Sequence, residues 1–109
     1  VGLTEEAAKA QKIDYVTGKF PLSANGKSMI MGEDGMIKII AGKKYKEILG
    51  AHILGPRATD LIGELALAIG MEATIDEVIS TIHAHPTVSE AVKEAALAVD
   101  KRAIHIPNK

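Results

Sequence analysis

The pattern of apolar and polar residues changes along the chain, from partial alternation in the first half to helical periodicity in the second. Residues 13–20 alternate in part and end before a proline, which predicts a strand. Residues 36–40 and 45–54 are rich in Ile and Leu and flank a short connection that contains glycine, which predicts a β-hairpin. Residues 23–28 have turn-forming composition. Before them, Thr4 predicts the N-cap of a helix that ends near residue 11.

Three helices are predicted in the second half. Residues 58–69 carry one apolar stripe, and Gly70 is placed to end that helix. A capping box begins a short helix at residue 74, and a second, formed by Thr87 and Glu90, begins the last helix. The apolar face of that last helix matches the 3.6-residue period at Val88, Ala91, Val92, Ala95, Ala96 and Val99. The pattern predicts one α+β domain over residues 1–109, an antiparallel β-sheet with helices packed on one face.

Composition narrows the classes of function. The 109 residues have a net charge of −1 and only two Tyr and one Phe, which argues against a nucleic-acid surface or binding to anionic lipid. No apolar run is long enough to predict a membrane span. The absence of cysteine excludes disulfides, thiolate metal sites and a cysteine nucleophile within these residues, and it fits a reducing compartment.

Polar chemistry is concentrated in residues 81–90, between two predicted helices. The two histidines there, His83 and His85, form an H-x-H pair that could offer two imidazoles to zinc. Two ligands do not make a metal site, and neither the following proline nor the following threonine is a usual ligand. We therefore predict no metal site, and we consider an acid–base role for this segment instead.

Glu90 has two possible roles. It can cap the helix by accepting the backbone N–H of Thr87, or it can accept a hydrogen bond from His85 and make the other imidazole nitrogen a better base. Its two oxygens could serve both, and His85 itself could equally be a buried structural histidine. Pro86 drives the preceding residue out of helical geometry, and a cis bond at this position is possible.

The sequence H-A-H-P-T-V-S-E at residues 83–90 strongly resembles a segment of the flavin-dependent disulfide oxidoreductases, and among them the dihydrolipoamide dehydrogenases. The resemblance covers nearly the whole chain and implies the C-terminal dimerisation, or interface, domain of that family. Further similar segments are residues 1–7, 34–38, 48–55, 64–69 and 106–108.

The resemblance implies a homodimer with shared active sites. One subunit supplies FAD and a redox-active cysteine pair, and the interface domain of the other supplies the base. Carried over to this sequence, the base is His85, its orienting carboxylate is Glu90, and His85 and Pro86 contact the FAD of the partner subunit. The implied reaction oxidises dihydrolipoamide to lipoamide with NAD, and the implied partners are the lipoyl domains of 2-oxo-acid dehydrogenase complexes.

The resemblance also implies that residues 1–109 are part of a longer protein. They contain no G-x-G-x-x-G sequence, so the FAD- and NAD-binding domains are absent from them. We expect the isolated chain to bind no cofactor and to have no activity, but to associate through the helices predicted at residues 58–69 and after Thr87. The expected location is the cytoplasm, or the mitochondrial matrix in a eukaryote. The alternatives are the same domain from a glutathione or mercuric reductase type of enzyme, or a homodimerisation module without a catalytic role.

Overall fold

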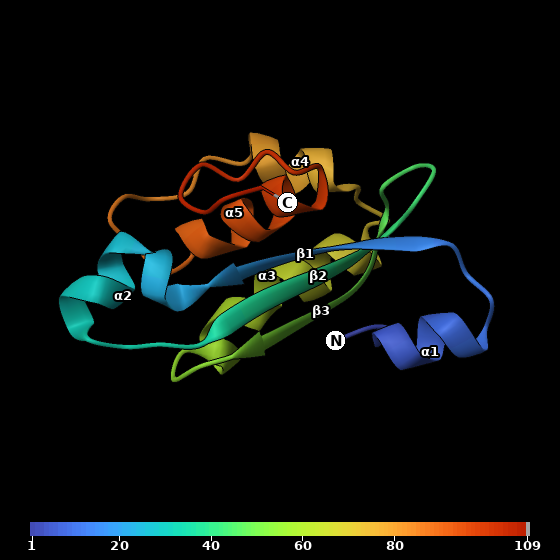
Figure 1. Cartoon of the computed structure of the whole chain (residues 1–109). Coiled ribbons are helices and arrows are strands. Elements are labelled where there is room, and N and C mark those ends of the chain that lie inside the picture. Colours follow the sequence, from blue (N-terminus) through green and yellow to red (C-terminus); the bar gives the residue numbers. More distant parts are fainter. Residues whose placement is uncertain (109) are drawn as a thin grey trace.

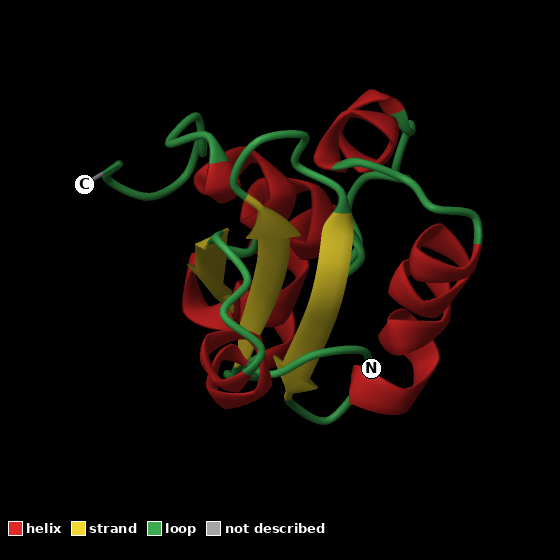
Figure 2. Cartoon of the chain, turned by 90° about the vertical axis from the view of Figure 1, so that its right-hand side faces the viewer, coloured by secondary structure: helices red, strands yellow, loops and turns green. Residues whose placement is uncertain are grey.

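Three consecutive strands pair antiparallel in the order β1-β2-β3 in the computed structural model, which describes residues 1–108 (Figure 1). They are β1 (Tyr15–Pro21), β2 (Met36–Gly42) and β3 (Ile48–Leu54). The two strands predicted around the glycine-containing connection do form a hairpin. In the turned view of Figure 2 the strands lie side by side and the helices flank them. The predicted α+β fold with an antiparallel sheet is confirmed.

Helices account for most of the remaining chain. The strongest of the sequence patterns, the one after Thr87, gives the helix whose whole predicted face is buried. The helical elements are α1 (Glu5–Ala10), the 3₁₀ turn η1 (Leu22–Ala24), α2 (Gly26–Met31), α3 (Ala58–Gly70), α4 (Ile75–Ser80) and α5 (Glu90–Val99). None of the helices among residues 1–108 is both long and apolar enough to cross a membrane.

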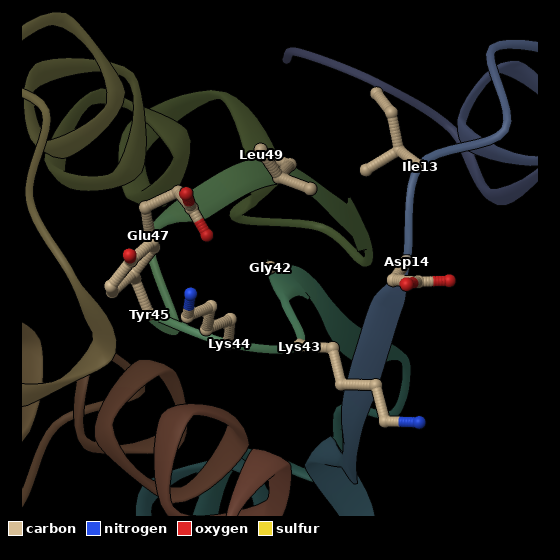
Figure 3. Close-up of a pocket in the computed structure, with 8 residues that line it drawn as sticks. All are labelled: Ile13, Asp14, Gly42, Lys43, Lys44, Tyr45, Glu47 and Leu49. Atoms are coloured by element: carbon tan, nitrogen blue, oxygen red, sulfur yellow. The ribbon is translucent and has the colours of Figure 1, made fainter.

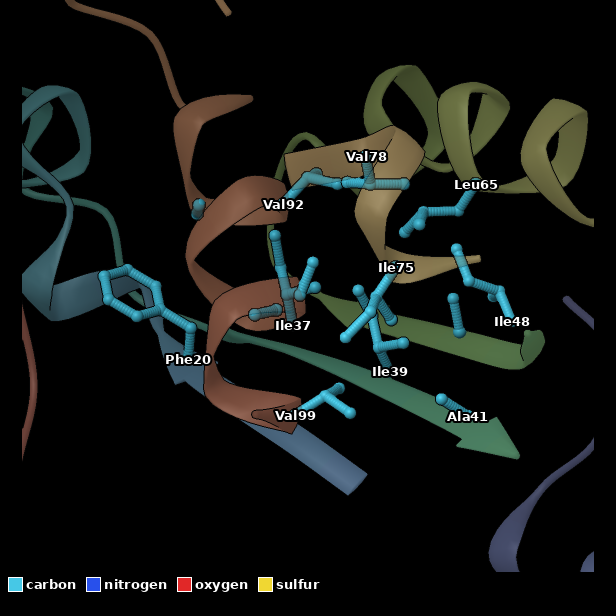
Figure 4. Packing of buried hydrophobic residues seen from close by; sticks show 14 of the residues in the cluster. Phe20, Ile37, Ile39, Ala41, Ile48, Leu65, Ile75, Val78, Val92 and Val99 are labelled. Carbon is cyan, nitrogen blue, oxygen red and sulfur yellow. The ribbon is translucent and has the colours of Figure 1, made fainter. Parts of the chain in front are cut away.

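The core lies between one face of the sheet and the helices α3, α4 and α5. Helix α5 packs on β1 and β2, α3 packs on β3, and α4 packs on α5. Figure 4 shows side chains of β2, such as Ile37 and Ile39, pointing toward the helices, in the same buried cluster as Val92 of α5 and Leu65 of α3. Burial of this aliphatic surface is the main force that holds the helices on the sheet.

The N-terminal segment adds to the free edge of β3. Leu3 N–H donates to Leu49 O at 2.9 Å, and Ala51 N–H donates to Val1 O at 2.9 Å. Gly50 permits this close approach, because a Cβ there would lie 2.0 Å from Leu3 O. Helix α1, which follows, reaches the sheet on the side away from the core, where Glu5 forms a salt bridge with Lys38 at 3.0 Å.

The structure corrects several predicted boundaries. The second hairpin strand begins at Ile48 rather than at residue 45, because Lys46 N–H bonds to Gly42 O within the turn and Lys46 has a φ of 60°. The predicted turn at residues 23–28 instead contains η1 and the start of α2, with Asn25 as N-cap. Gly70 is the last residue of α3, and the left-handed conformation that follows falls on Glu72, with a φ of 57°.

Candidate active site

His85 lies on the loop between α4 and α5, and its side chain is 79% exposed. The loop leaves α4 at Thr81, whose extended backbone ends the helix. The His85–Pro86 peptide bond is cis. Because most of its side chain is exposed, His85 is a surface residue, and the alternative of a buried structural histidine is wrong for this side chain.

The Nδ1 atom of His85 faces the carboxylate of Glu90, at 2.9 Å from Oε1 and 3.1 Å from Oε2. Glu90 is the first residue of α5, so the helix fixes the position of the carboxylate. An ionised carboxylate accepts a hydrogen bond, which places a proton on Nδ1 and leaves the Nε2 lone pair available. Within residues 1–108, Nε2 of His85 has no hydrogen-bond partner.

Glu90 also serves the loop backbone. Its Oε1 accepts the N–H of Thr87 at 3.0 Å, so one carboxylate makes both of the contacts that the sequence left open. The reciprocal half of the predicted capping box is absent from this segment: the Thr87 hydroxyl donates to Ala84 O at 2.5 Å and also contacts the Ser89 hydroxyl at 2.8 Å. Ser89 is the N-cap, without a side-chain cap hydrogen bond. The Thr87 hydroxyl is thus used to close the loop instead of capping α5.

The environment of Glu90 favours its charged form. Burial raises the pKa of the carboxyl, but the hydrogen bonds from Thr87 N–H and His85 and the charges of His85 and His105 together outweigh it, so the pKa lies below its ordinary value of 4.5. At neutral pH the group facing Nδ1 is consequently a carboxylate.

Two further histidine–glutamate pairs lie near this one. His83 Nε2 is 2.7 Å from Glu64 Oε2 of α3, and the His83 side chain is only 6% exposed. His105 Nδ1 is 3.2 Å from Glu94 Oε1, and Glu94 also accepts the backbone N–H groups of residues 104 and 105. Sequence reasoning missed both pairs. Glu94 follows Glu90 by one helical turn and could have been noticed, whereas nothing local connects Glu64 to His83.

His85 and Glu90 line a groove of about 400 Å³ together with His83, His105 and Lys93. Exposed apolar side chains, Met29 and Ile82 among them, border the same groove. No cluster of three or more potential ligands from His, Asp or Glu occurs in residues 1–108 in a geometry that could hold a metal ion. The groove therefore combines an oriented imidazole with an apolar rim.

A second hollow, of about 450 Å³, lies at the other end of the sheet beside the β2–β3 turn (Figure 3). Figure 3 shows Lys43, Lys44 and Glu47 around it, and Asp14 beside Lys43, whose N–H donates to Asp14 O at 3.1 Å. It contains no histidine, and none of its charged side chains is in a pair like that of His85 and Glu90. We take the groove at His85 as the candidate site.

A family model described as the dimerisation domain of pyridine nucleotide-disulphide oxidoreductases matches residues 1–96. The chain is 53% identical over 106 residues to dihydrolipoyl dehydrogenase of Bacillus subtilis, which covers 96% of this chain and 22% of that protein. It is 47% identical over 110 residues to dihydrolipoyl dehydrogenase of Halobacterium salinarum, which covers 100% of this chain and 23% of that protein. The chain thus spans about a fifth of the length of these curated relatives.

Solved structures give the same family. LpdA from Mycobacterium tuberculosis matches with a TM-score of 0.83 and 26% identity, over 88% of this chain and 21% of that one. The HOCl-induced flavoprotein disulfide reductase RclA from Escherichia coli matches with a TM-score of 0.82 and 25% identity, over 88% and 22%. The family resemblance inferred from the sequence is confirmed. The chain belongs to the dimerisation-domain family of the pyridine nucleotide-disulphide oxidoreductases, and its relatives in that family include dihydrolipoyl dehydrogenases.

Proposed function

We propose that this chain is the dimerisation domain of a longer flavoenzyme, and that His85 with Glu90 forms the acid–base pair of the active site of the partner subunit. The FAD- and NAD-binding domains then lie in the part of the protein outside residues 1–109. The observation that carries the proposal is the contact of His85 Nδ1 with Glu90 on a ring that is otherwise exposed. A histidine with only a structural role in its own subunit would be buried in the core of that subunit.

The proposed chemistry requires a proton acceptor near a thiol. Dihydrolipoamide attacks a disulfide as a thiolate, yet a thiol with a pKa of about 8.5 is mostly protonated at neutral pH. Nε2 of His85 takes the proton from the attacking thiol while the carboxylate of Glu90 stabilises the imidazolium that forms. The attack breaks the cysteine disulfide, forms a mixed disulfide with the substrate and releases one cysteine sulfur as a thiolate, to which the same nitrogen can return the proton. The second thiol of the substrate then loses its proton and attacks the mixed disulfide, so that lipoamide leaves, the second cysteine sulfur is released and the cysteine pair is left reduced.

The residues at the loop surface fit contact with a flavin held by another subunit. His85 and Pro86 are both exposed, and the ring nitrogen that does not face Glu90 has no hydrogen-bond partner within residues 1–108. When bound against His85 and Pro86, FAD would supply the redox chemistry that links the cysteine pair to NAD. This chain contributes no thiol to that transfer, because it has no cysteine. We therefore expect residues 1–109 alone to have no dehydrogenase activity.

Of the two helices that we expected at the dimer interface, α3 and α5, helix α3 is the better candidate for the contact across the two-fold axis. The exposed residues between Gly63 and Gly70 are small or apolar, and the one charged side chain in that stretch, Glu64, is 31% exposed and paired with His83. Leu67 and, directly after the helix, Met71 are 64% and 73% exposed. Neither glycine is required by packing within this chain, since a Cβ at either position would meet nothing within 4 Å. A second copy of α3 that approaches closely explains both the small and the apolar residues on this side.

Helix α5, which we also expected at the interface, uses its apolar face internally. Ala91, Val92, Ala95 and Ala96 are all fully buried against the chain's own sheet and helices. Only the side that carries Glu90, Lys93 and Glu94 lines the groove. In the proposed dimer α5 places the carboxylate of Glu90 and leaves most of the apolar contact to α3.

A chimera tests the proposed role of His85. This chain replaces the matching fifth of the Bacillus subtilis enzyme, to which it is 53% identical, and dihydrolipoamide oxidation is measured with NAD. We expect His85→Gln to lower kcat/KM by roughly two to four orders of magnitude, the usual contribution of a general base. His105→Gln is the matched control, because His105 is also exposed, also paired with a glutamate and on the same groove.

The outcome separates the remaining alternatives. Equal activity of the two variants would leave this chain as a dimerisation module without a catalytic residue. A chimera that dimerises and reduces glutathione disulfide or mercuric ion in preference to lipoamide would assign the domain to another disulfide reductase. The identities to dihydrolipoyl dehydrogenases support the lipoamide substrate.

A further inference from the structure

The loop that carries His85 is held by two side chains from distant parts of the sequence. It spans residues 82–89 and lies outside the helices and strands. Because the His85 ring is mostly exposed, packing around the ring cannot fix its direction. The direction depends on the backbone of the loop and on Glu90.

Asn25 holds the C-terminal side of the loop. Its Nδ2 donates to Thr87 O at 3.0 Å, while its Oδ1 accepts Ser28 N–H at 2.9 Å and caps α2. The residue is only 5% exposed, so both bonds are protected from water. Thr87 in turn donates its N–H to the Glu90 oxygen that is 2.9 Å from His85 Nδ1. A continuous chain of hydrogen bonds thus runs from Asn25 to His85.

Glu64 holds the N-terminal side. Its Oε2 is 2.7 Å from Nε2 of His83, two residues before His85, and the His83 ring is almost fully buried. Glu64 belongs to α3, which packs on the sheet independently of the loop. The two anchors therefore connect the loop to α2 on one side and to α3 on the other.

We propose that Asn25 and Glu64 are positioning residues that fix the direction of the His85 ring. Neither touches the ring, so neither is a catalytic residue. This inference rests on the proposed function of His85, since a base must be held close to its proton donor and a displacement of 1 Å can reduce a rate by about a hundredfold. Without the anchors the loop would still connect α4 and α5, but Thr87, Glu90 and His85 would not keep one arrangement.

Substitution of Asn25 can remove its hydrogen bond to Thr87 and keep its hydrogen bond from Ser28. Asn25→Asp retains a strong N-cap for α2 but removes the donor to Thr87 O. The matched control is Ser28→Ala, since Ser28 is fully buried beside Asn25 and its hydroxyl has no partner within residues 1–108. Should Asn25→Asp fail to fold, Asn25→Ser is used, because serine also caps the helix and is too short to reach Thr87.

Nuclear magnetic resonance of the 109-residue chain gives the readout. In Asn25→Asp or Asn25→Ser we expect the Thr87 amide to exchange with water about tenfold faster, the effect of one lost buried hydrogen bond, and the ¹⁵N shift of His85 Nδ1 to move toward that of a free imidazole. The amides of α5 and β2 should keep their wild-type exchange rates. Ser28→Ala should leave both signals unchanged. A folded Asn25 variant with wild-type Thr87 exchange and His85 shifts would overturn the inference.

Glu64 offers a rescue test. Glu64→Ala removes the partner of His83 and should broaden the signals of the loop, whereas Glu64→Gln keeps an acceptor for His83 Nε2–H and should restore them. Equal spectra of the two variants would contradict the second anchor. None of these readouts depends on catalysis. The activity of the chimera therefore tests the role of His85, and the spectra of the isolated chain test the two anchors, so that failure of one proposal can be told from failure of the other.

Discussion

At the scale of single residues, the carboxylate of Glu90 does two things at once: it accepts the N–H of Thr87 and faces Nδ1 of His85. Its lowered pKa makes the stability that it contributes depend on pH. The contribution is complete above the unfolded value, near 4.5, and is lost as the pH falls through the lower folded value. We predict that Glu90→Gln costs about 1 kcal/mol at pH 7, the usual net value of a hydrogen bond, and that this cost shrinks as the pH falls through the lowered folded pKa of the carboxyl.

Urea unfolding of both proteins between pH 2 and pH 7 measures this difference. Glu6→Gln is the control, because Glu6 is exposed in the first turn of α1 and has no ion pair within residues 1–108. A difference between wild type and Glu90→Gln that stays constant over the whole range would show that the carboxylate charge is not responsible.

The residue-scale contacts that the sequence could predict are the local ones. His85 and Glu90 are five positions apart on either side of a helix start, so their pairing follows from spacing. The contact of Asn25 with Thr87 spans 62 positions and that of Glu64 with His83 spans 19. Such pairs depend on where α2 and α3 come to lie, which no local pattern contains. The roles of His85, Glu90 and Pro86 toward substrate and FAD stay predictions.

At the scale of elements, every residue of the predicted apolar face of the last helix is buried, because burial on one side imposes the 3.6-residue period on the sequence. Val88 belongs to this buried set but precedes α5, which begins at Glu90. Helix α5 approaches β1 closely at Gly18, where a Cβ would lie 2.3 Å from Ala95 O. We predict that Gly18→Ala destabilises the chain by about 1–3 kcal/mol, as overpacking does. Thermal unfolding checks this result, and a wild-type midpoint would mean that α5 can move off β1 without cost.

Short helices α1 and α4 were predicted with their threonine N-caps, whereas α2 and the β2–β3 turn were not predicted as they are. Helix α2 has only six residues, and its asparagine N-cap and following glycine equally suit a turn. The turn between β2 and β3 takes in Tyr45, an aromatic residue that favours strands, because the hydrogen bond from Lys46 to Gly42 closes the turn first. Tertiary contacts and turn geometry decide these boundaries, and composition does not.

At the scale of the whole molecule, the proposed dimer depends on the outward side of α3. We predict that Leu67→Lys combined with Met71→Lys shifts the chain from dimer to monomer in sedimentation velocity, because two cations would face their copies across the two-fold axis. Tyr45→Lys is the control, since Tyr45 is a large exposed side chain that lies on the β2–β3 turn and not on α3. Equal dimerisation of both variants would place the interface elsewhere.

Gly63 gives a second measurement on the same surface. In the monomer Gly63→Ala should stabilise α3 by about 0.5–1 kcal/mol, because alanine is the better helix former and its Cβ meets nothing in this chain. In the dimer the same Cβ should hinder the approach of a second α3 and weaken association. A variant that gains stability and dimerises as tightly as wild type would rule out close packing of the helices at this position.

Mixed dimers of the chimera show whether His85 acts in the active site of the partner subunit. One subunit carries His85→Gln, and the other has intact His85 but lacks its redox cysteines. Only a site that combines the cysteines of the first with His85 of the second can work. We predict that random mixing restores about a quarter of wild-type dihydrolipoamide oxidation, because half of the dimers are mixed and each has one working site. Activity no higher than the sum of the two parent dimers would contradict the account.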